Sequence, residues 1–281
     1  MIIDTHVHFY DPTRPQGVPW PRSDNALLYR TALPEHCKAL AVPEGVSGVV
    51  IVEASPWVAD NQWILDLAEN EPFIVGFVGN LNPESDDFEA NLDRFSANPL
   101  FRGIRIGGGR NVQKIESGAL IPELEKLAER NLALDLLVRQ AELPTVGALA
   151  ARIPDLRIVL DHVAHVPIDG KTPDSEWTQG MRTAAAHPNV YCKVSALPEM
   201  AQDQPAPGNL AYYVPTLDAL WEAFGEDRLL YGSNWPVCER AADYGSVIRI
   251  VTEYFKGKGE AACEKYFWKN SAVAYKWVDR A

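Results

Sequence analysis

The sequence is poor in cysteine, in basic residues and in long hydrophobic runs. Its four cysteines, Cys37, Cys192, Cys238 and Cys263, are far apart and form no C-x-x-C pair. This argues against a disulfide framework or a thiolate zinc site and predicts reduced thiols. No apolar run reaches the roughly 18 residues needed to span a bilayer, and the opening MIIDTHVHF lacks the basic and apolar regions of a secretory signal. We therefore expect a cytoplasmic protein without a membrane partner.

The charge balance is acidic, which narrows the choice of partner further. Against 38 Asp and Glu there are only 26 Lys and Arg, a formal net charge of −12, and no local basic patch offsets it. Such a surface repels phosphate backbones, so nucleic acid is not an expected partner. A small-molecule substrate is the expected ligand, and the sequence leaves the oligomeric state open.

Eight short apolar runs, rich in β-branched residues, determine the expected fold class. They cover residues 2–7, 48–53, 73–79, 103–106, 133–138, 156–161, 190–194 and 229–232. Most are apolar at successive positions, which is typical of buried parallel strands. Eight such strands predict an α/β fold, a (β/α)8 barrel of the TIM type. No linker or repeat divides the 281 residues, so we expect a single barrel domain over residues 1–281.

Helical patterns separate these runs. Over residues 60–70 the apolar residues form one stripe, and Asp60 is placed to cap the first turn. Over residues 122–131, Pro122 suits a helix start, and Asn131 can adopt the left-handed conformation that ends a helix.

Three long connections, residues 9–30, 163–188 and 195–215, follow the carboxyl ends of the first, sixth and seventh strands. Active sites of such barrels lie on this face, so these loops are expected to wall a pocket. Aromatic residues in the loops either line that pocket or only pack the loops together. They are Phe9, Tyr10, Trp20, Trp177, Tyr212 and Tyr213.

Three histidines are the strongest candidates for chemistry. His6 and His8 lie two apart at the end of the first strand, so both imidazoles should face the barrel interior. His162 ends the sixth strand and should project into the same mouth, whereas its neighbour Asp161 should point the other way. Three converging imidazoles suit a divalent metal, zinc or manganese, and equally suit a metal-free site that polarises a carbonyl directly.

Further charged residues lie at other strand ends. Glu53 ends the second strand, where it could bind a metal, accept a proton or orient a histidine, or form an ion pair with a basic residue of a neighbouring strand. Arg105 and Lys193 end the fourth and seventh strands and could hold a substrate carboxylate, a hydroxyl or a developing oxyanion. His165, in the loop after the sixth strand, is a further candidate for substrate contact.

Motifs along nearly the whole chain resemble the amidohydrolase superfamily, and within it the group of sugar lactonases and 2-pyrone-4,6-dicarboxylate lactonase. They are DTHVHFYDP, PQGVPWP, GIR, IVLDHVAHVP, KVS, YGSNWPV and KNSAVAY. The combination of HxH, a DH on the sixth strand and GS(D/N)WP on the eighth is specific to that group. Tyr10 and Trp235, which lie within two of these motifs, are accordingly expected to contact substrate.

The resemblance implies a site made of His6, His8, His162 and residue 234. The family has an aspartate at this last position, but here it is Asn234, and an amide cannot act as a base. Either Glu53 or His162 then takes the proton, or Asn234 orients a water that a metal acidifies, or hydrolysis is lost.

Hydrolysis of a lactone ring, by attack of water on a carbonyl, is the expected activity. The expected substrate is a sugar acid or a related carboxylated small molecule. Two alternatives stay open on the same barrel: a metal-dependent non-oxidative decarboxylase, and an inactive barrel that only binds a small molecule.

Overall fold

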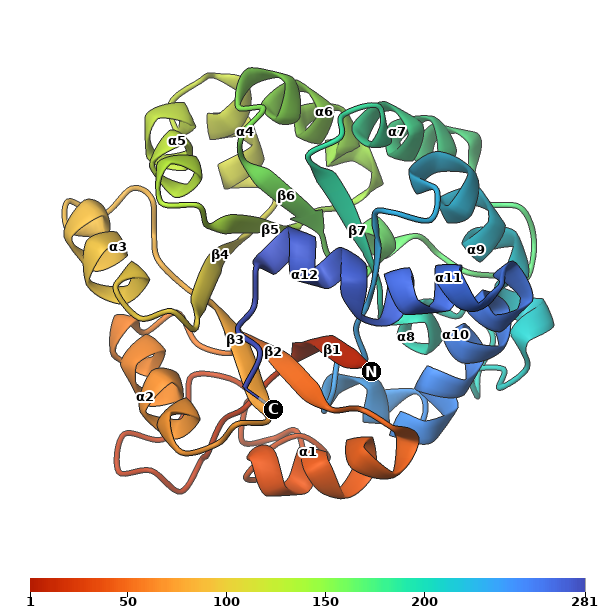
Figure 1. Cartoon of the computed structure of the whole chain (residues 1–281), viewed down its shortest axis with the longest axis horizontal. Helices are drawn as coiled ribbons and strands as arrows, with labels where there is room; N and C mark the ends of the chain where they lie inside the picture. The colour runs from red at the N-terminus through yellow and green to blue at the C-terminus, as the bar shows by residue number, and fades with distance from the viewer. Residues whose placement is uncertain (281) are drawn as a thin grey trace.

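The computed structural model describes residues 1–280, and its eight strands form one parallel sheet in the order β1 to β8 (Figure 1). The strands are β1 (Ile3–Val7), β2 (Gly48–Val52), β3 (Ile74–Gly79), β4 (Phe101–Gly107), β5 (Ala133–Leu137), β6 (Arg157–Leu160), β7 (Val190–Val194) and β8 (Leu229–Tyr231). Beyond the end of β8, Trp235 pairs with Val7, and its carbonyl accepts a hydrogen bond from the His8 N–H at 2.8 Å. The sheet therefore nearly closes on itself, and the predicted barrel is confirmed.

Helices surround the barrel and cover the outer faces of the strands, and the last helix lies across one end of the barrel (Figure 1). They are α1 (Pro34–Ala41), α2 (Val58–Glu69), α3 (Phe88–Ser96), α4 (Arg110–Glu116), α5 (Ile121–Glu129), α6 (Leu143–Arg152), α7 (Ser175–Ala185), α8 (Leu197–Met200), α9 (Leu210–Phe224), α10 (Tyr244–Lys258), α11 (Glu260–Glu264) and α12 (Asn270–Tyr275). Their buried faces and the outward-facing strand residues form the larger hydrophobic core.

Two details of the expected helices can be compared with the structure. The stripe at 60–70 belongs to α2, which begins two residues earlier at Val58, so Asp60 lies inside the first turn and is not the cap. Its carboxylate instead binds Arg14 at 2.9 Å and fastens the loop after β1. Asn131, after α5, has a φ of 57° and so adopts the predicted left-handed conformation.

Two of the connections predicted to be long loops contain helices. Residues 163–188 include α7, and residues 195–215 include α8 and the first turns of α9. In α7 the Asp174 side chain caps the helix by accepting the Glu176 N–H, a local signal that the loop prediction overlooked.

Small and β-branched side chains fill the barrel interior, and the C-terminal segment closes its amino-terminal end. The inner cluster includes Val50, Val159 and Leu230 together with Tyr275 of α12. Gly103 of β4 has no room for a side chain, because a Cβ there would lie 2.4 Å from the Ala133 carbonyl oxygen. With this end closed, the opposite end of the barrel is left open for a site.

Within residues 1–280, no helix is both long enough and apolar enough to cross a membrane. The four cysteines are free thiols, three of them buried.

Candidate active site

A change of strand register directs His6 of β1, and His8 just after the strand, into the barrel. The pairing of β1 with β2 shifts between Asp4 and Val7. Asp4 therefore faces outwards, where its carboxylate accepts the Tyr244 hydroxyl of α10 at 2.9 Å, whereas His6 faces inwards. The rings of His6 and His8 lie 5.0 Å apart, so the predicted convergence of the pair is confirmed.

Asp4 also joins the first and last strands beneath the site. Its Oδ1 accepts the Ser233 N–H at 2.8 Å and the His6 N–H at 3.1 Å. The Asn234 N–H donates to the His6 carbonyl at 2.9 Å. These bonds fix the backbone that carries His6 against the segment after β8.

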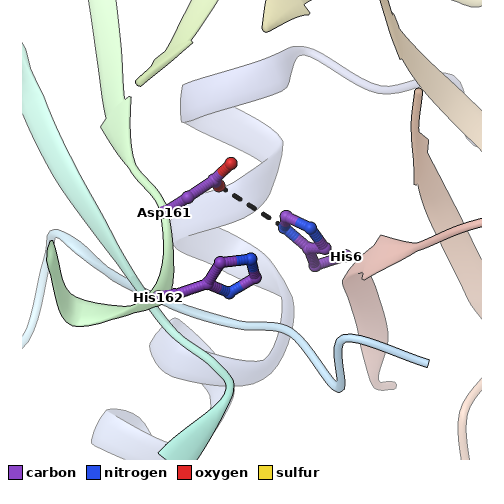
Figure 2. Close-up of side chains that lie close together, drawn as sticks. All are labelled: His6, Asp161 and His162. Carbon is purple, nitrogen blue, oxygen red and sulfur yellow. Dashed lines mark ion pairs between the residues drawn. The ribbon is translucent and has the colours of Figure 1, made fainter. Parts of the chain in front are cut away.

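The end of β6 brings both Asp161 and His162 into the mouth of the barrel (Figure 2). Asp161 was expected to point away, and that expectation is wrong: its Oδ1 lies 3.4 Å from His6 Nδ1. Val159 faces the barrel interior, and the strand period of two places Asp161 on the same face. His162 is brought round by four consecutive residues with positive φ, from His162 to His165. Non-glycine residues seldom adopt this conformation, and such strain is commonly found at functional sites.

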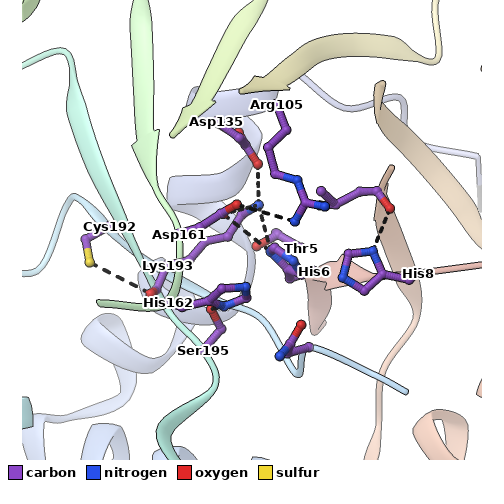
Figure 3. A network of polar contacts seen from close by, with 12 residues as sticks. Thr5, His6, His8, Arg105, Asp135, Asp161, His162, Cys192, Lys193 and Ser195 are labelled. Carbon is purple, nitrogen blue, oxygen red and sulfur yellow. Dashed lines mark hydrogen bonds and ion pairs between the residues drawn. The ribbon is translucent and has the colours of Figure 1, made fainter. Parts of the chain in front are cut away.

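A column of buried charge runs down the barrel axis below the histidines. Lys193 Nζ of β7 lies 2.5 Å from Asp135 Oδ2 of β5 and 3.2 Å from Asp161 Oδ1 (Figure 3). The Tyr275 hydroxyl of α12 donates to Asp135 at 2.9 Å. All four side chains are fully buried. Lys193, Asp135 and Tyr275 therefore support His6 and Asp161 from below.

A cavity of about 670 Å³ opens at the carboxyl ends of the strands, within the range of roughly 300–1,000 Å³ that is usual for small-molecule sites. Its polar lining residues are His8, Glu53, Arg105, His162, His165, Glu199, Gln204, Asn234 and Arg240, and its apolar ones include Trp20, Leu137, Met200 and Val237. The cavity thus combines hydrogen-bonding groups of both charges with flat apolar surface.

Arg105 and Glu53 form an ion pair in the cavity wall. Arg105 Nε donates to Glu53 Oε1 at 2.8 Å, and its Nη2 donates to the Glu53 carbonyl oxygen at the same distance. Both side chains are 14% exposed. The structure thus contains the ion pair that was one of the two sequence interpretations of Glu53. Arg105 is held rigidly with its guanidinium at the cavity.

Three of the predicted substrate contacts lie outside the cavity. Lys193 belongs to the buried column. Trp235 is fully buried, and its indole N–H donates to Glu239 at 2.9 Å. Tyr10 donates its hydroxyl to the Leu28 carbonyl at 2.8 Å and supports the Trp20 ring from behind, with the ring centroids 5.4 Å apart.

Of the remaining predicted positions all but His6, which is fully buried, line the cavity. His165 and Trp20 both face it, and Trp20 is the one aromatic of the three predicted loops that does so. The other loop aromatics tie the loops together, as Trp177 does through its bond to the Val163 carbonyl at 2.9 Å.

Glu199 is a cavity residue that the sequence interpretation missed. It lies on α8, a single helical turn that begins after Ala196, whose φ is 57°. Its Oε1 accepts the Asn234 amide N–H at 2.8 Å. Its Oε2 is buried and finds no hydrogen-bond partner among residues 1–280. The available signal was a single carboxylate in the apolar segment SALPEMA, directly after a strand end.

Burial keeps the imidazoles of the site neutral. It lowers the pKa of His8 to about 3, with the Arg105 charge adding to the effect. Burial likewise lowers the pKa of His162 to about 3, and that of His6 well below its usual range. The site at neutral pH therefore presents imidazole nitrogen lone pairs rather than imidazolium charges.

His6, Asp161 and His162 could together hold a metal ion (Figure 2). One potential ligand atom of each lies within 4.8 Å of the others. His6 Nε2 and both Asp161 carboxylate oxygens are buried and make no hydrogen bond within the described residues, although Lys193 Nζ lies 3.2 Å from Asp161 Oδ1. An imidazole nitrogen without a partner beside a buried carboxylate fits a divalent ion. His8, the third ligand predicted from the sequence, is replaced in this group by Asp161.

Comparisons with known proteins agree with this architecture. The pattern of the amidohydrolase family matches residues 3–277. The chain is 34% identical over 245 residues to the L-fucono-1,5-lactonase of Burkholderia ambifaria, which covers 86% of this chain and 83% of that one. It is 28% identical to the L-fucono-1,5-lactonase of Burkholderia multivorans, over 96% and 94% of the two chains. The crystal structure of an amidohydrolase from Burkholderia multivorans with bound zinc matches with a TM-score of 0.88, at 26% identity and 99% coverage of both chains.

Proposed function

This chain belongs to the amidohydrolase family, and we propose that it is a hydrolase that opens the lactone ring of a sugar acid by attack of water on the carbonyl carbon. The resemblance stated from the sequence motifs is thereby confirmed. Two relatives named as lactonases, aligned over most of the chain, favour ring hydrolysis over decarboxylation.

The observation that supports a polyhydroxylated substrate most directly is the tautomer of two cavity histidines. His8 Nδ1 lies 2.9 Å from the Val52 carbonyl, and His165 Nδ1 lies 3.1 Å from the Val138 carbonyl. A carbonyl oxygen only accepts, so each Nδ1 carries the proton and each Nε2 is left as an acceptor. Two such acceptors in one cavity suit the hydroxyl groups of a sugar.

Arg105 is the cavity group best placed to receive developing negative charge. The guanidinium is fixed by Glu53, so no reorganisation is needed when the carbonyl oxygen becomes an oxyanion. Trp20 offers a flat apolar surface against which a sugar ring can pack. Together these groups would fix the ring and its carbonyl.

A divalent ion, zinc or manganese, would be held by His6, Asp161 and His162, and when bound it would supply Lewis-acid polarisation to this site. Ser195 Oγ, 2.8 Å from His162 Nδ1, orients that imidazole so that Nε2 is available. Lys193 Nζ and Asp161 Oδ1 lie 3.3 Å and 3.4 Å from His6 Nδ1, and His6 Nε2 has no hydrogen-bond partner among residues 1–280.

The test is lactone hydrolysis followed through the proton released, with L-fucono-1,5-lactone compared with δ-valerolactone, which has the same ring size and no hydroxyl groups. Leaving a buried acceptor unpaired costs about 1–3 kcal/mol, so kcat/KM should favour the sugar lactone by at least about 100-fold.

His165→Phe should lower that preference, whereas His187→Phe serves as the matched control, because His187 lies before β7 at the opposite end of the barrel. Equal turnover of both lactones would refute the sugar assignment, and the absence of turnover of any lactone would refute the proposed activity.

A further inference from the structure

Hydrolysis requires a group that takes a proton from the attacking water, and residue 234 cannot supply it. Asn234 is an amide, and its Nδ2 donates to Glu199 Oε1 at 2.8 Å. An amide nitrogen that donates has no basic lone pair to offer. The side chain therefore acts on the carboxylate beside it rather than on water.

The two bases considered from the sequence are both engaged. Glu53 is held in its ion pair with Arg105 at 2.8 Å, and a proton placed on it would break that pair. His162 Nδ1 lies 2.8 Å from Ser195 Oγ, and its imidazole belongs with His6 and Asp161 to the group that would hold a metal ion. An imidazole that serves as a metal ligand must keep its lone pair for the ion.

We propose that Glu199 is the residue that accepts the proton from the attacking water, with Asn234 as the residue that positions its carboxylate. Glu199 lines the cavity. One oxygen is held by Asn234, and the other, Oε2, is buried without a partner among the residues that the structure describes. A carboxylate with one anchored and one free oxygen can take a proton in a defined direction. This inference rests on the proposed lactonase activity.

The surroundings of Glu199 suit this role. Burial raises the pKa of Glu199 to about 7, and the hydrogen bond from Asn234 acts in the opposite direction and limits this rise. The titratable and charged groups around it are Arg240, Cys238 and Tyr213, of which Arg240 contributes a positive charge that also lowers the pKa. A carboxyl group that titrates near neutral pH can both take up and return a proton at that pH.

The step balances as follows. The water oxygen forms a bond to the lactone carbonyl carbon, and one water proton passes to Glu199 Oε2. When the ring C–O bond breaks, the departing alkoxide takes this proton from Glu199 and becomes a hydroxyl. The new carboxylic acid loses its own proton to solvent, so each turnover consumes one water and releases one proton.

The first test compares Glu199→Gln with the wild-type enzyme on L-fucono-1,5-lactone. A lost general base lowers rates about 10²–10⁴-fold, so we expect kcat to fall at least 100-fold with KM changed less than about threefold. Wild-type kcat/KM should fall as the pH drops through about 7, because Glu199 then becomes protonated, and this dependence should disappear in the variant. Formate should restore activity to Glu199→Ala. The matched control is Glu129→Gln, an exposed glutamate outside the cavity, which should leave kcat unchanged.

The second test uses Asn234→Gly, since glycine tolerates the positive φ of 63° at this position. Loss of the amide removes a bond that stabilises the charged carboxylate, so the pH below which activity is lost should move upward, with activity recovered at higher pH. If the Asn234 amide had only a structural role, the acid limb of the pH profile, where activity falls with decreasing pH, would stay where it is.

The outcomes separate the two claims. An active wild-type enzyme with an unaffected Glu199→Gln, or with an unmoved limb in Asn234→Gly, would overturn the assignment of Glu199 and leave the lactonase activity standing. A wild-type chain that hydrolyses no lactone would overturn both. If Glu199→Gln does not fold, as judged by circular dichroism, the Asn234→Gly profile decides the matter.

Discussion

Replacing Lys193 with methionine should destabilise the protein severely and leave substrate affinity almost unchanged. The ammonium lies 2.5 Å from Asp135 and 3.2 Å from Asp161, and none of the three side chains is exposed to solvent. Removing one partner of a buried ion pair costs about 3–5 kcal/mol, because a charge is left without compensation. Two carboxylates share this cation, so the free energy of unfolding should fall by about that amount in metal-free buffer.

The loss should depend on pH with a defined sign. Burial raises the pKa of Asp135 to about 6 in the wild-type protein, even though Lys193 lowers it. Without the ammonium this pKa rises further, so the folded variant binds a proton that the unfolded chain releases. Folded-state proton uptake makes stability decrease as pH rises through the raised pKa. The deficit should therefore be larger at pH 8 than at pH 5.5.

Urea unfolding of Lys193→Met at these two pH values measures the effect. Lys171→Met is the control, since Lys171 is 81% exposed and forms a surface ion pair with Asp169 at 3.3 Å. The free energy of unfolding of this variant should differ from the wild-type value by less than about 0.5 kcal/mol. A deficit below about 1 kcal/mol at pH 8, or a KM raised more than about tenfold in a protein of unchanged stability, would refute the buried-column interpretation and place Lys193 on the substrate.

Three further outcomes follow from the site. Wild-type protein expressed in medium with zinc or manganese should carry about one ion per chain by elemental analysis. His6→Asn should lose this ion and His8→Asn should keep it, whereas loss of the ion in both variants would restore His8 as a ligand. Arg105→Lys should lower kcat about 10²–10³-fold, as removal of an oxyanion donor does, and an unchanged kcat would exclude that role. In native protein one thiol per chain, Cys263, should react rapidly with a thiol reagent, since the other three are buried; two or more fast thiols would contradict the packing.

The barrel and its histidines could be predicted because they depend on regular patterns. All eight apolar runs are strands whose ends lie within about two residues of the expected positions, since buried parallel strands are continuously hydrophobic. The spacing of His6 and His8 predicted their shared direction, although the register shift that turns them inward is not visible in the sequence.

Two parts of the site depended on backbone conformations that the sequence does not signal. The run of positive φ from His162 to His165 includes Val163 and Ala164, residues that rarely adopt it. In a regular strand, Asp161 and His162 would face opposite ways, and Asp161 was therefore wrongly placed outside the site. Glu199 was missed because α8 is a single turn that alternation and helical periodicity cannot detect.

The fate of the predicted substrate contacts follows from burial. Three predicted contacts belong to motifs or strand ends near the mouth, yet the polar group of each hydrogen-bonds to another residue of the chain. They are Tyr10, Trp235 and Lys193. A sequence motif indicates that a family requires a residue at a position. Only the packing shows whether that residue contacts the ligand or supports a neighbour that does.

Attack of water on a lactone carbonyl is tested most directly by turnover of L-fucono-1,5-lactone in ¹⁸O-labelled water, with the product analysed by mass spectrometry. Hydrolysis at the carbonyl should place one ¹⁸O atom in the carboxylate of each product molecule and release no carbon dioxide. Label found at the ring hydroxyl, release of carbon dioxide, or no acceleration over the uncatalysed reaction would contradict the proposed function.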